Sequence, residues 1–332
     1  IRLVESGPAG GAILAARIAA ERGERDILSF DMGGTTAKIC LIEDGAPLKA
    51  RSFEVDRSSR FMKGSGMPVR IPVIEMVEIG AGGGSQARVD ALGRVAVGPE
   101  SAGSDPGPAC YGRGGTQPTV TDADLVLGRI APQAFAGGRI ALDPAASERA
   151  LKAALGEPLG HDDLTASAYA VSEVVDENMA AAARTHAAEF GLDLASRDMV
   201  AFGGAAPLHA ARLGQKLGVN RIVVPAGAGV GSAIGFLLAP VAYEVVRSRH
   251  QDLSDLQAEL VNSLMEEMKA EALDVVQKGV GPDKAATDLL ESRHAYMRYV
   301  GQGHEISVRL PVENYTERHG GIFRDCFEAA YR

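Results

Sequence analysis

The sequence predicts an α/β fold, in which helices cover a sheet whose strands end in glycine-rich turns. An apolar run at residues 27–30 leads into Asp31 and a Gly-Gly pair. A second apolar run at residues 199–202 leads into another Gly-Gly pair and then a helical pattern. Short apolar runs bounded by glycine are typical of buried strands, and their alternation with helical patterns is typical of α/β domains.

The first fifty residues predict a strand, a helix and two further strands. Residues 1–4 are apolar enough for a strand, and Ser6-Gly7-Pro8 is typical of a helix start. Apolar side chains then recur at helical spacing over residues 9–21 and stop before Gly23. The buried strand at residues 27–31 and a second strand at residues 39–42 follow, with a glycine turn between them.

The middle of the chain is rich in glycine and proline, and it predicts short elements. We expect strands within residues 71–79 and 88–97, the latter containing a hairpin turn at residues 89–94, and a short helix after Thr119 that ends near Gly128. A long helix at residues 165–190 follows, closed by Gly191.

Residues 199–332 predict strands and helices in alternation, followed by a charged helix and a strand pair. The strand at residues 199–202 is followed by a helix at 206–217, a strand at 221–224 and a helix rich in small residues at 231–238. A charged amphipathic helix is expected at 253–277, two strands at 291–299 and 305–310, and a helical pattern from Phe323.

Composition and charge narrow the function classes. The chain has 332 residues and a net charge of -9, with no basic stripe, so we expect no nucleic-acid partner. No apolar run is long enough to span a bilayer, and we expect no membrane partner. The 3 cysteines stand singly, which is typical of a reduced, cytoplasmic protein. The chain lacks a starting Met, and we expect it to be a piece of a longer protein.

The glycine turn after the first buried strand is the leading candidate for a phosphate site. Asp31 stands at the strand tip, and Gly33 and Gly34 allow a tight turn whose N–H groups face a phosphate, with the hydroxyls of Thr35 and Thr36 adding hydrogen bonds. Mg²⁺ prefers few carboxylates and keeps its waters, so Asp31 is the candidate metal ligand and catalytic residue. The alternative is a plain β-hairpin with a Gly-Gly turn.

Two further glycine clusters are candidate ligand contacts. Gly203, Gly204 and Ala205 connect a strand to a helix, a geometry that lets a flat ring or a phosphate approach the backbone; an ordinary turn is the alternative. The triplet Gly82, Gly83 and Gly84 forms either an anion-binding nest or a tightly packed loop.

The order of these pieces resembles the second lobe of the actin/hexokinase/heat-shock chaperone ATPase fold, which is ribonuclease H-like. The resemblance implies that the helices at residues 9–21 and 231–238 cross at a hinge, where Gly231, Ser232, Ala233 and Gly235 suit close approach. It also implies an ATPase lobe at residues 1–50 and 198–245, an inserted Gly/Pro-rich subdomain at 51–197, and the start of a C-terminal domain at 246–332.

Several longer motifs resemble those of the hydantoinase/oxoprolinase family large subunit, across residues 5–310. They lie at residues 6–11 (SGPAGG), 31–36 (DMGGTT), 78–85 (EIGAGGGS), 98–103 (GPESAG), 105–112 (DPGPACYG), 202–207 (FGGAAP) and 298–302 (RYVGQ).

The family resemblance implies ATP and Mg²⁺ as cofactors and an ATP-dependent hydrolase acting on a cyclic amide of the hydantoin, 5-oxoproline or lactam type. A ketone carboxylase subunit is the alternative within the family. The resemblance further implies a second, B-type subunit. It also places an earlier phosphate loop, absent from this chain, in a first lobe, so we expect this piece alone to be inactive.

Several other polar residues could have either a functional or a structural role. Lys38 follows the first glycine turn where many relatives of the fold have Asp; it is either a phosphate-facing cation or a solvated strand residue. We expect Cys110 to be a packed thiol rather than a nucleophile, because no base stands near it in the sequence. Asp122 and Asp124 suit helix capping better than a metal site with Asp105.

The two remaining candidates are histidines, His186 and His209, both on predicted helices. For each we expect a structural or surface role. The rival functions outside this family are a non-enzymatic regulatory module of the same ATPase fold and a kinase for a small hydroxyl substrate. The kinase would need an Asp base that no motif here supplies.

Overall fold

The computed structural model describes residues 6–50, 53–55, 65–69, 73–280 and 289–331. The predicted strand at residues 1–4 and the first two residues of the predicted strand at 71–79 lie outside the described residues. The chain divides into two compact units, Ile1–Ala239 and Pro240–Arg332. The second unit thus begins a few residues before the predicted boundary at 246.

The first unit is built on a mixed six-stranded sheet, so the predicted α/β class is confirmed. Its strand order is β12-β11-β1-β2-β3, and β8 pairs with β2 as well. The parallel pairs join β1 to β11 and β11 to β12, whereas β2 runs antiparallel to β1, β3 and β8. The strand bounds are β1 (Ile27–Met32), β2 (Ala37–Glu43), β3 (Ala46–Pro47), β8 (Met76–Ile79), β11 (Asp198–Phe202) and β12 (Ile222–Val223).

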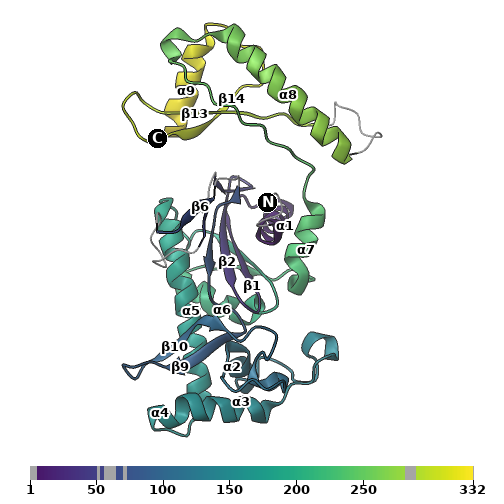
Figure 1. The fold of residues 1–332 in the computed structure, drawn as a ribbon, viewed down its shortest axis with the longest axis vertical. Coiled ribbons are helices and arrows are strands. Elements are labelled where there is room, and N and C mark those ends of the chain that lie inside the picture. The colour runs from purple at the N-terminus through teal and green to yellow at the C-terminus, as the bar shows by residue number, and fades with distance from the viewer. Residues whose placement is uncertain (1–5, 51–52, 56–64, 70–72, 281–288, 332) are drawn as a thin grey trace. The chain divides into compact units, whose positions relative to one another are not determined.

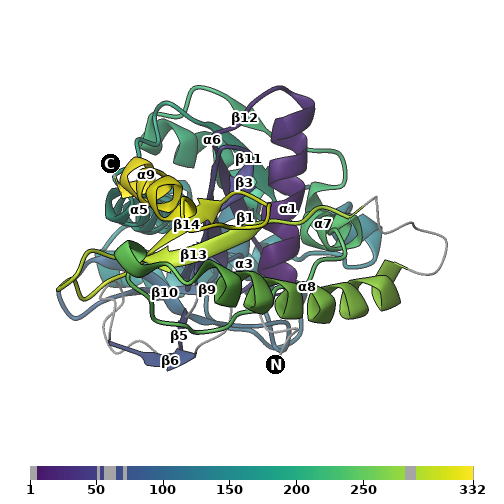
Figure 2. The same cartoon turned by 90° about the horizontal axis from the view of Figure 1, so that it is seen from above.

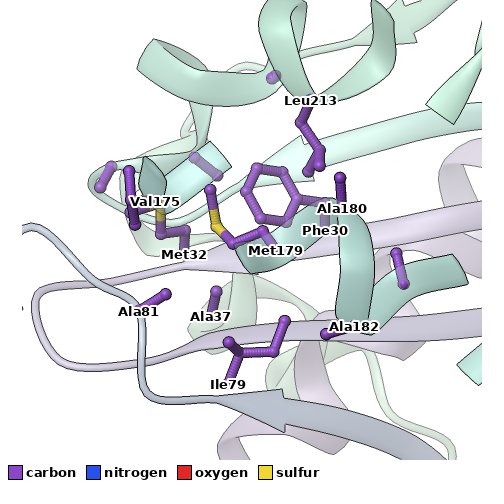
Figure 3. Close-up of a cluster of buried hydrophobic side chains, with 14 of the residues drawn as sticks. Phe30, Met32, Ala37, Ile79, Ala81, Val175, Met179, Ala180, Ala182 and Leu213 are labelled. Atoms are coloured by element: carbon purple, nitrogen blue, oxygen red, sulfur yellow. The ribbon is translucent and has the colours of Figure 1, made fainter. Parts of the chain in front are cut away.

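Helices cover both faces of this sheet, with α1 (Ser6–Glu21) on one face and α5 (Leu164–Glu189) and α6 (Ala206–Leu217) on the other (Figures 1 and 2). On the α5/α6 face, Phe30 and Met32 of β1 lie beside Met179 of α5 and Leu213 of α6 (Figure 3). Ile27 instead packs in the cluster that contains Ala15 and Ala19 of α1.

Alternation along the strands decides which side chains reach the α1 face. Successive strand residues point to opposite faces. Since Phe30 and Met32 face α5, Asp31 faces α1, and its antiparallel neighbour Lys38 on β2 lies on that face too. The predicted catalytic residue and the predicted cation therefore share one side of the sheet.

Part of the predicted insertion belongs to the same body as the strands of the predicted ATPase lobe. β8 hydrogen-bonds to β2, and α5 packs on the sheet, so one core runs through both regions. The remaining strands are β4 (Lys49–Ala50) with β7 (Val73–Ile74), β5 (Phe53–Val55) with β6 (Met67–Val69), and the hairpin β9 (Ser85–Val89) and β10 (Val95–Ser101). The hairpin and the short helix α2 (Val120–Val126) confirm two predictions.

One helix of this region was not predicted, α3 (Pro144–Leu151). Its start carries ordinary signals, because Pro144 occupies the first turn and the Asp143 carboxylate accepts a hydrogen bond from the Ala145 N–H at 3.0 Å. A π-helical segment at Lys152–Gly156 and the short α4 (Glu157–Leu159) continue it.

The second unit contains α8 (Ala258–Val280), the hairpin β13 (Arg293–Met297) and β14 (Ile306–Leu310), and α9 (His319–Tyr331). Its core joins Ala258 of α8, Val308 and Leu310 of β14, and Phe323 and Phe327 of α9. The predicted helix at residues 253–277 begins later than expected, since Leu253–Asp255 forms a separate 3-10 turn whose N-cap is Asp252.

Candidate active site

The predicted phosphate loop follows β1, which ends at Met32, one residue after the half-buried Asp31. The Asp31 carboxylate accepts a hydrogen bond of 2.5 Å from the Ser232 hydroxyl, which comes from α7 (Gly231–Leu238). Burial raises the pKa of Asp31, against the lowering effects of the Ser232 hydrogen bond and the Lys38 charge. The carboxylate therefore lies in a protein environment that holds its position and alters its acidity.

The loop itself is a tight turn with an exposed tip. The Gly33 N–H donates to the Thr36 carbonyl at 3.1 Å, and Gly34 and Thr35 between them are exposed. The Lys38 ammonium donates to Thr36 Oγ1 at 2.8 Å and pairs with Glu78 of β8 at 3.2 Å. Lys38 is thus a half-buried cation beside the loop, and it differs from the solvated strand residue that was one of its two predicted roles.

The glycine triplet Gly82–Gly84 packs against the loop at residues 33–36. A Cβ on Gly82 would lie 2.6 Å from backbone atoms of Gly34 and Thr35, so only glycine permits this approach. The N–H groups of Gly83 and Gly84 donate to the carbonyls of Gly33 and Gly34 at 3.0 and 2.6 Å.

The Gly82 N–H also has a partner within the protein, because it donates to Ser85 Oγ at 2.9 Å. The three N–H groups are therefore engaged inside the protein, and all three glycines are buried. This arrangement favours the packed-loop alternative for Gly82–Gly84 over the anion nest.

The strand-to-helix loop at Gly203 meets the phosphate loop at the end of the sheet. The Ala205 N–H donates to the Met32 carbonyl at 2.9 Å, directly beside Asp31. Gly203 has φ +102, and a Cβ there would lie 2.4 Å from the Met32 carbonyl oxygen and 2.5 Å from Asp31 Oδ1. The two predicted ligand loops therefore converge, with Gly204 exposed next to them.

The two helices predicted to cross do so through their glycines. A Cβ on Gly235 of α7 would lie 1.8 Å from the Gly10 carbonyl oxygen of α1, and one on Gly10 would lie 2.2 Å from the Ser232 carbonyl oxygen. Glycine on both helices allows backbone contact. This contact places the Ser232 hydroxyl where it reaches Asp31, a role that the sequence did not reveal.

The other candidates have structural roles. Asp122 is buried at the start of α2, where it forms a capping box with Thr119, and its carboxylate also accepts hydrogen bonds from the N–H groups of Ala109 and Cys110 at 3.1 and 2.8 Å. Burial, with the charge of Asp122, raises the pKa of the fully buried Cys110 thiol, so a thiolate is disfavoured. The packed-thiol interpretation is supported, and so is the capping role of Asp122. Asp124 has a different role from the predicted cap, because its carboxylate pairs with Arg129 and His209.

Neither predicted histidine is a surface residue. His186 is buried in α5, and His209 is fully buried in α6 between Asp176 and Asp124. Among the described residues no group of three or more His, Cys, Asp or Glu side chains could hold a metal ion, so a three-ligand site with Asp105, Asp122 and Asp124 does not form there. In the same part of the chain, no helix is long and apolar enough to cross a membrane.

Comparison with known proteins finds relatives that match nearly the whole of this chain. The chain is 31% identical to the caprolactamase subunit alpha of Pseudomonas jessenii, over 100% of this chain and 46% of that protein. The solved structure of nucleotide-free acetone carboxylase matches with a TM-score of 0.77 at 27% identity, over 98% of this chain and 45% of that one. The structure of the ATP-dependent caprolactamase from Pseudomonas jessenii matches with a TM-score of 0.74 at 30% identity, over 98% and 45%.

The chain spans about half the length of the curated relatives it matches. Residues 1–245 match the family model described as hydantoinase/oxoprolinase. They include the whole of the site around Asp31. The chain therefore belongs to the hydantoinase/oxoprolinase family.

Proposed function

We propose that this chain forms one side of the ATP site of an enzyme that activates the carbonyl of a cyclic amide for hydrolysis. The observation that carries the proposal is the meeting of two loops at one end of the sheet, joined by the hydrogen bond from the Ala205 N–H to the Met32 carbonyl. One loop offers Asp31 and an exposed glycine turn, and the other offers an exposed Gly204.

In this proposal each loop has its own part of the nucleotide. Residues 33–36 contact the phosphates, and residues 203–205 contact the adenosine. Gly82–Gly84, predicted as direct contacts, instead act by supporting the phosphate loop, as their hydrogen bonds indicate. The close crossing of α1 and α7 supports the further proposal that the first unit is the second lobe of an actin/hexokinase/chaperone-type ATPase fold.

Asp31 is the group that fits a magnesium ion. Mg²⁺ in nucleotide sites takes one or two carboxylates together with substrate phosphates and water, and a single half-buried carboxylate at a strand end suits that need. Bound Mg²⁺ would neutralise charge on the phosphates. Ser232 fixes one Asp31 oxygen by a hydrogen bond, which leaves the orientation of the carboxylate defined.

The proposed chemistry is phosphoryl transfer to the amide oxygen, with ADP as the leaving group. This makes the carbonyl carbon a better electrophile, and water adds to it. The ring C–N bond then breaks as the nitrogen takes up a proton, and a second water releases inorganic phosphate from the resulting acyl phosphate. Catalysis of such a transfer consists mainly of positioning and charge neutralisation. In the proposal, backbone N–H groups and Lys38 supply these directly, and Asp31 contributes by holding the magnesium ion. The similarity to caprolactamase supports a cyclic amide as the substrate class. The proposed enzyme also contains a second, B-type subunit and is located in the cytoplasm.

A test compares the Asp31→Asn and Asp44→Asn variants of the full-length protein. Asp44 follows β2 at its opposite end and is exposed, so its variant is the matched control. ATP hydrolysis is measured with hydantoin, 5-oxoproline and caprolactam. We expect one cyclic amide to stimulate wild-type hydrolysis and Asp31→Asn to lower kcat by about 100-fold or more, as is usual when a group that stabilises transferring charge is lost. Equal activity of the two variants would rule out this role for Asp31.

A ketone carboxylase is the second candidate, because the acetone carboxylase structure matches this chain closely. The same assay with acetone and bicarbonate separates the two. Stimulation by acetone alone among the substrates would replace the hydrolase by the carboxylase. No stimulation by any substrate, with tight ATP binding, would favour a regulatory module.

A further inference from the structure

The short helix α2 forms hydrogen bonds with Gly83, which binds the proposed phosphate loop, and with His209 of α6, the helix that follows the proposed adenosine loop. Six of its seven residues, from Val120 to Leu125, are buried. Two of its polar side chains, those of Thr121 and Asp124, are therefore inside the protein. Buried polar groups are retained where they have partners. Thr121 binds next to the proposed phosphate loop, and Asp124 binds the helix that follows the proposed adenosine loop.

On the phosphate side the partner is Gly83. Both the N–H and the hydroxyl of Thr121 donate to the Gly83 carbonyl, at 2.7 and 2.8 Å. The Gly83 N–H in turn donates to the Gly33 carbonyl at 3.0 Å. Two successive hydrogen-bond steps therefore connect α2 to the proposed phosphate loop.

On the adenosine side the partner is His209, in the first turns of the helix that follows Gly203-Gly204. Its Nε2 lies 3.1 Å from Asp124 Oδ2, and its Nδ1 lies 2.8 Å from Asp176 Oδ1 of α5. The Arg129 guanidinium binds the other oxygen of Asp124 at 2.9 Å and the Ser172 hydroxyl at 2.7 Å. Asp124 is thus fixed from both sides.

The His209 contact is ionic. Burial lowers the pKa of His209, but the hydrogen bonds and charges of Asp124 and Asp176 outweigh burial and raise it to about 9. The imidazole is therefore charged at neutral pH and compensates two buried carboxylates. With a neutral replacement, Asp124 keeps the Arg129 guanidinium, but Asp124 and Asp176 both lose the charged imidazole that joins them. The attachment of α6 to α2 and α5 is therefore sensitive to this one residue.

We infer that α2 sets the spacing of the two nucleotide loops, with Thr121, Asp124 and His209 as positioning residues that transmit a displacement of one loop to the other. The inference rests on the proposed function for its consequence in binding. The coupling of the two loops through α2 is a property of the ligand-free protein and does not depend on that function. Loss of the His209–Asp124 contact should then loosen the phosphate loop, although His209 does not contact that loop.

A second contact between α5 and α6 provides a matched control. Arg212 of α6 forms two hydrogen bonds, of 2.6 and 2.8 Å, with Glu173 of α5, and α2 takes no part in them. Arg212→Gln therefore weakens the attachment of α6 to α5 without touching α2. His209→Gln and Asp124→Asn each break the α2 connection, and using both guards against one variant failing to fold.

The first measurement is amide hydrogen exchange in the ligand-free full-length protein. We expect exchange at Gly83 and Gly84 to rise about tenfold in His209→Gln and in Asp124→Asn, and to remain at the wild-type rate in Arg212→Gln. Such a change corresponds to a usual coupling between sites. Increased exchange confined to α6, with Gly83 and Gly84 unchanged, would overturn the inference.

The second measurement is the affinity for magnesium tripolyphosphate, a probe that lacks the adenosine part. We expect His209→Gln to weaken its binding about tenfold and Arg212→Gln to leave it unchanged. Thr121→Val removes the hydroxyl hydrogen bond to Gly83 and keeps the backbone one, so it weakens this connection. In that background, His209→Gln should weaken binding less than it does alone. Full additivity of the two changes would refute the coupling.

The two readouts separate this inference from the proposed function. If the wild-type protein binds neither Mg-ATP nor the probe, the proposed ATP site fails, while the exchange result still decides whether α2 couples the loops. If the wild-type protein binds both and the exchange rates of the variants do not differ, the ATP site stands and the coupling fails.

Discussion

Replacement of Gly203 by alanine tests the convergence of the two loops most directly. The residue joins β11 to α6 and has φ +102, in the region that favours glycine. Its missing side chain leaves room for the Met32 carbonyl and the Asp31 carboxylate. A methyl group added there meets the end of β1 at Asp31 and Met32.

The expected cost follows from two effects. Backbone strain for a non-glycine residue at such φ is about 1–3 kcal/mol. Contacts of 2.4 Å to Met32 O and 2.5 Å to Asp31 Oδ1 cannot remain, and overpacking of this kind costs about 1–3 kcal/mol more. Restriction of the unfolded chain by alanine returns about 0.4–1 kcal/mol. We expect a net loss of about 1–5 kcal/mol in the free energy of unfolding.

Gly204 offers the matched control in the next position. It has no atom within 4 Å of an added Cβ, and its backbone is not in the positive-φ region. Urea unfolding of both variants is the assay, and Gly203→Ala should lower the midpoint by about 1 M if the urea dependence is about 3 kcal/mol per M. Gly204→Ala should match the wild type. Equal midpoints for the two variants would show that the loops do not meet as described.

Other predictions concern the supports of the site. Gly235→Ala should separate the crossing helices, because its Cβ would lie 1.8 Å from the Gly10 carbonyl oxygen, and should cost about 1–3 kcal/mol in urea unfolding; a wild-type midpoint would contradict the crossing. Asp122→Ala, which leaves buried N–H donors without an acceptor, should cost several kcal/mol, whereas Asp122→Asn should cost less. Cys110 should resist alkylation in the native protein and react after unfolding, and rapid native labelling would exclude a packed thiol. The pKa of His209 is raised to about 9, so its stabilisation is complete below about pH 6.5 and is lost as pH rises through 9; the pH dependence of unfolding should lose this slope in His209→Gln.

Much of the fold could be predicted because its signals are local. Apolar runs and glycines marked β1, β2, β11 and α6, since a short buried strand and a helix end each depend on neighbouring residues. Asp143 and Pro144 are typical of a helix start and could have indicated α3, but the helix is short and stands among glycine- and proline-rich loops. The predicted separate insertion could not be judged from sequence, because β8 joins the main sheet through pairing with β2 across a long connection.

The candidate site shows the same division. Asp31 and the glycines after it were identifiable, because a carboxylate at a strand tip before Gly-Gly is a sequential pattern. The sequence could not show that Gly82 packs on the phosphate loop, that Ser232 binds Asp31, or that His209 lies between Asp124 and Asp176. These contacts join residues far apart in the chain.

The sequence by itself determined the strands, the turns and the candidate loops of this protein, because these depend on backbone preferences and on the periodicity of nearby side chains. Only the tertiary structure decided which groups meet. Other elements supply the acceptor of the Gly83 N–H. Burial and partners from other elements also shift the pKa values of Asp31 and His209. Packing creates those surroundings, and no local pattern encodes them.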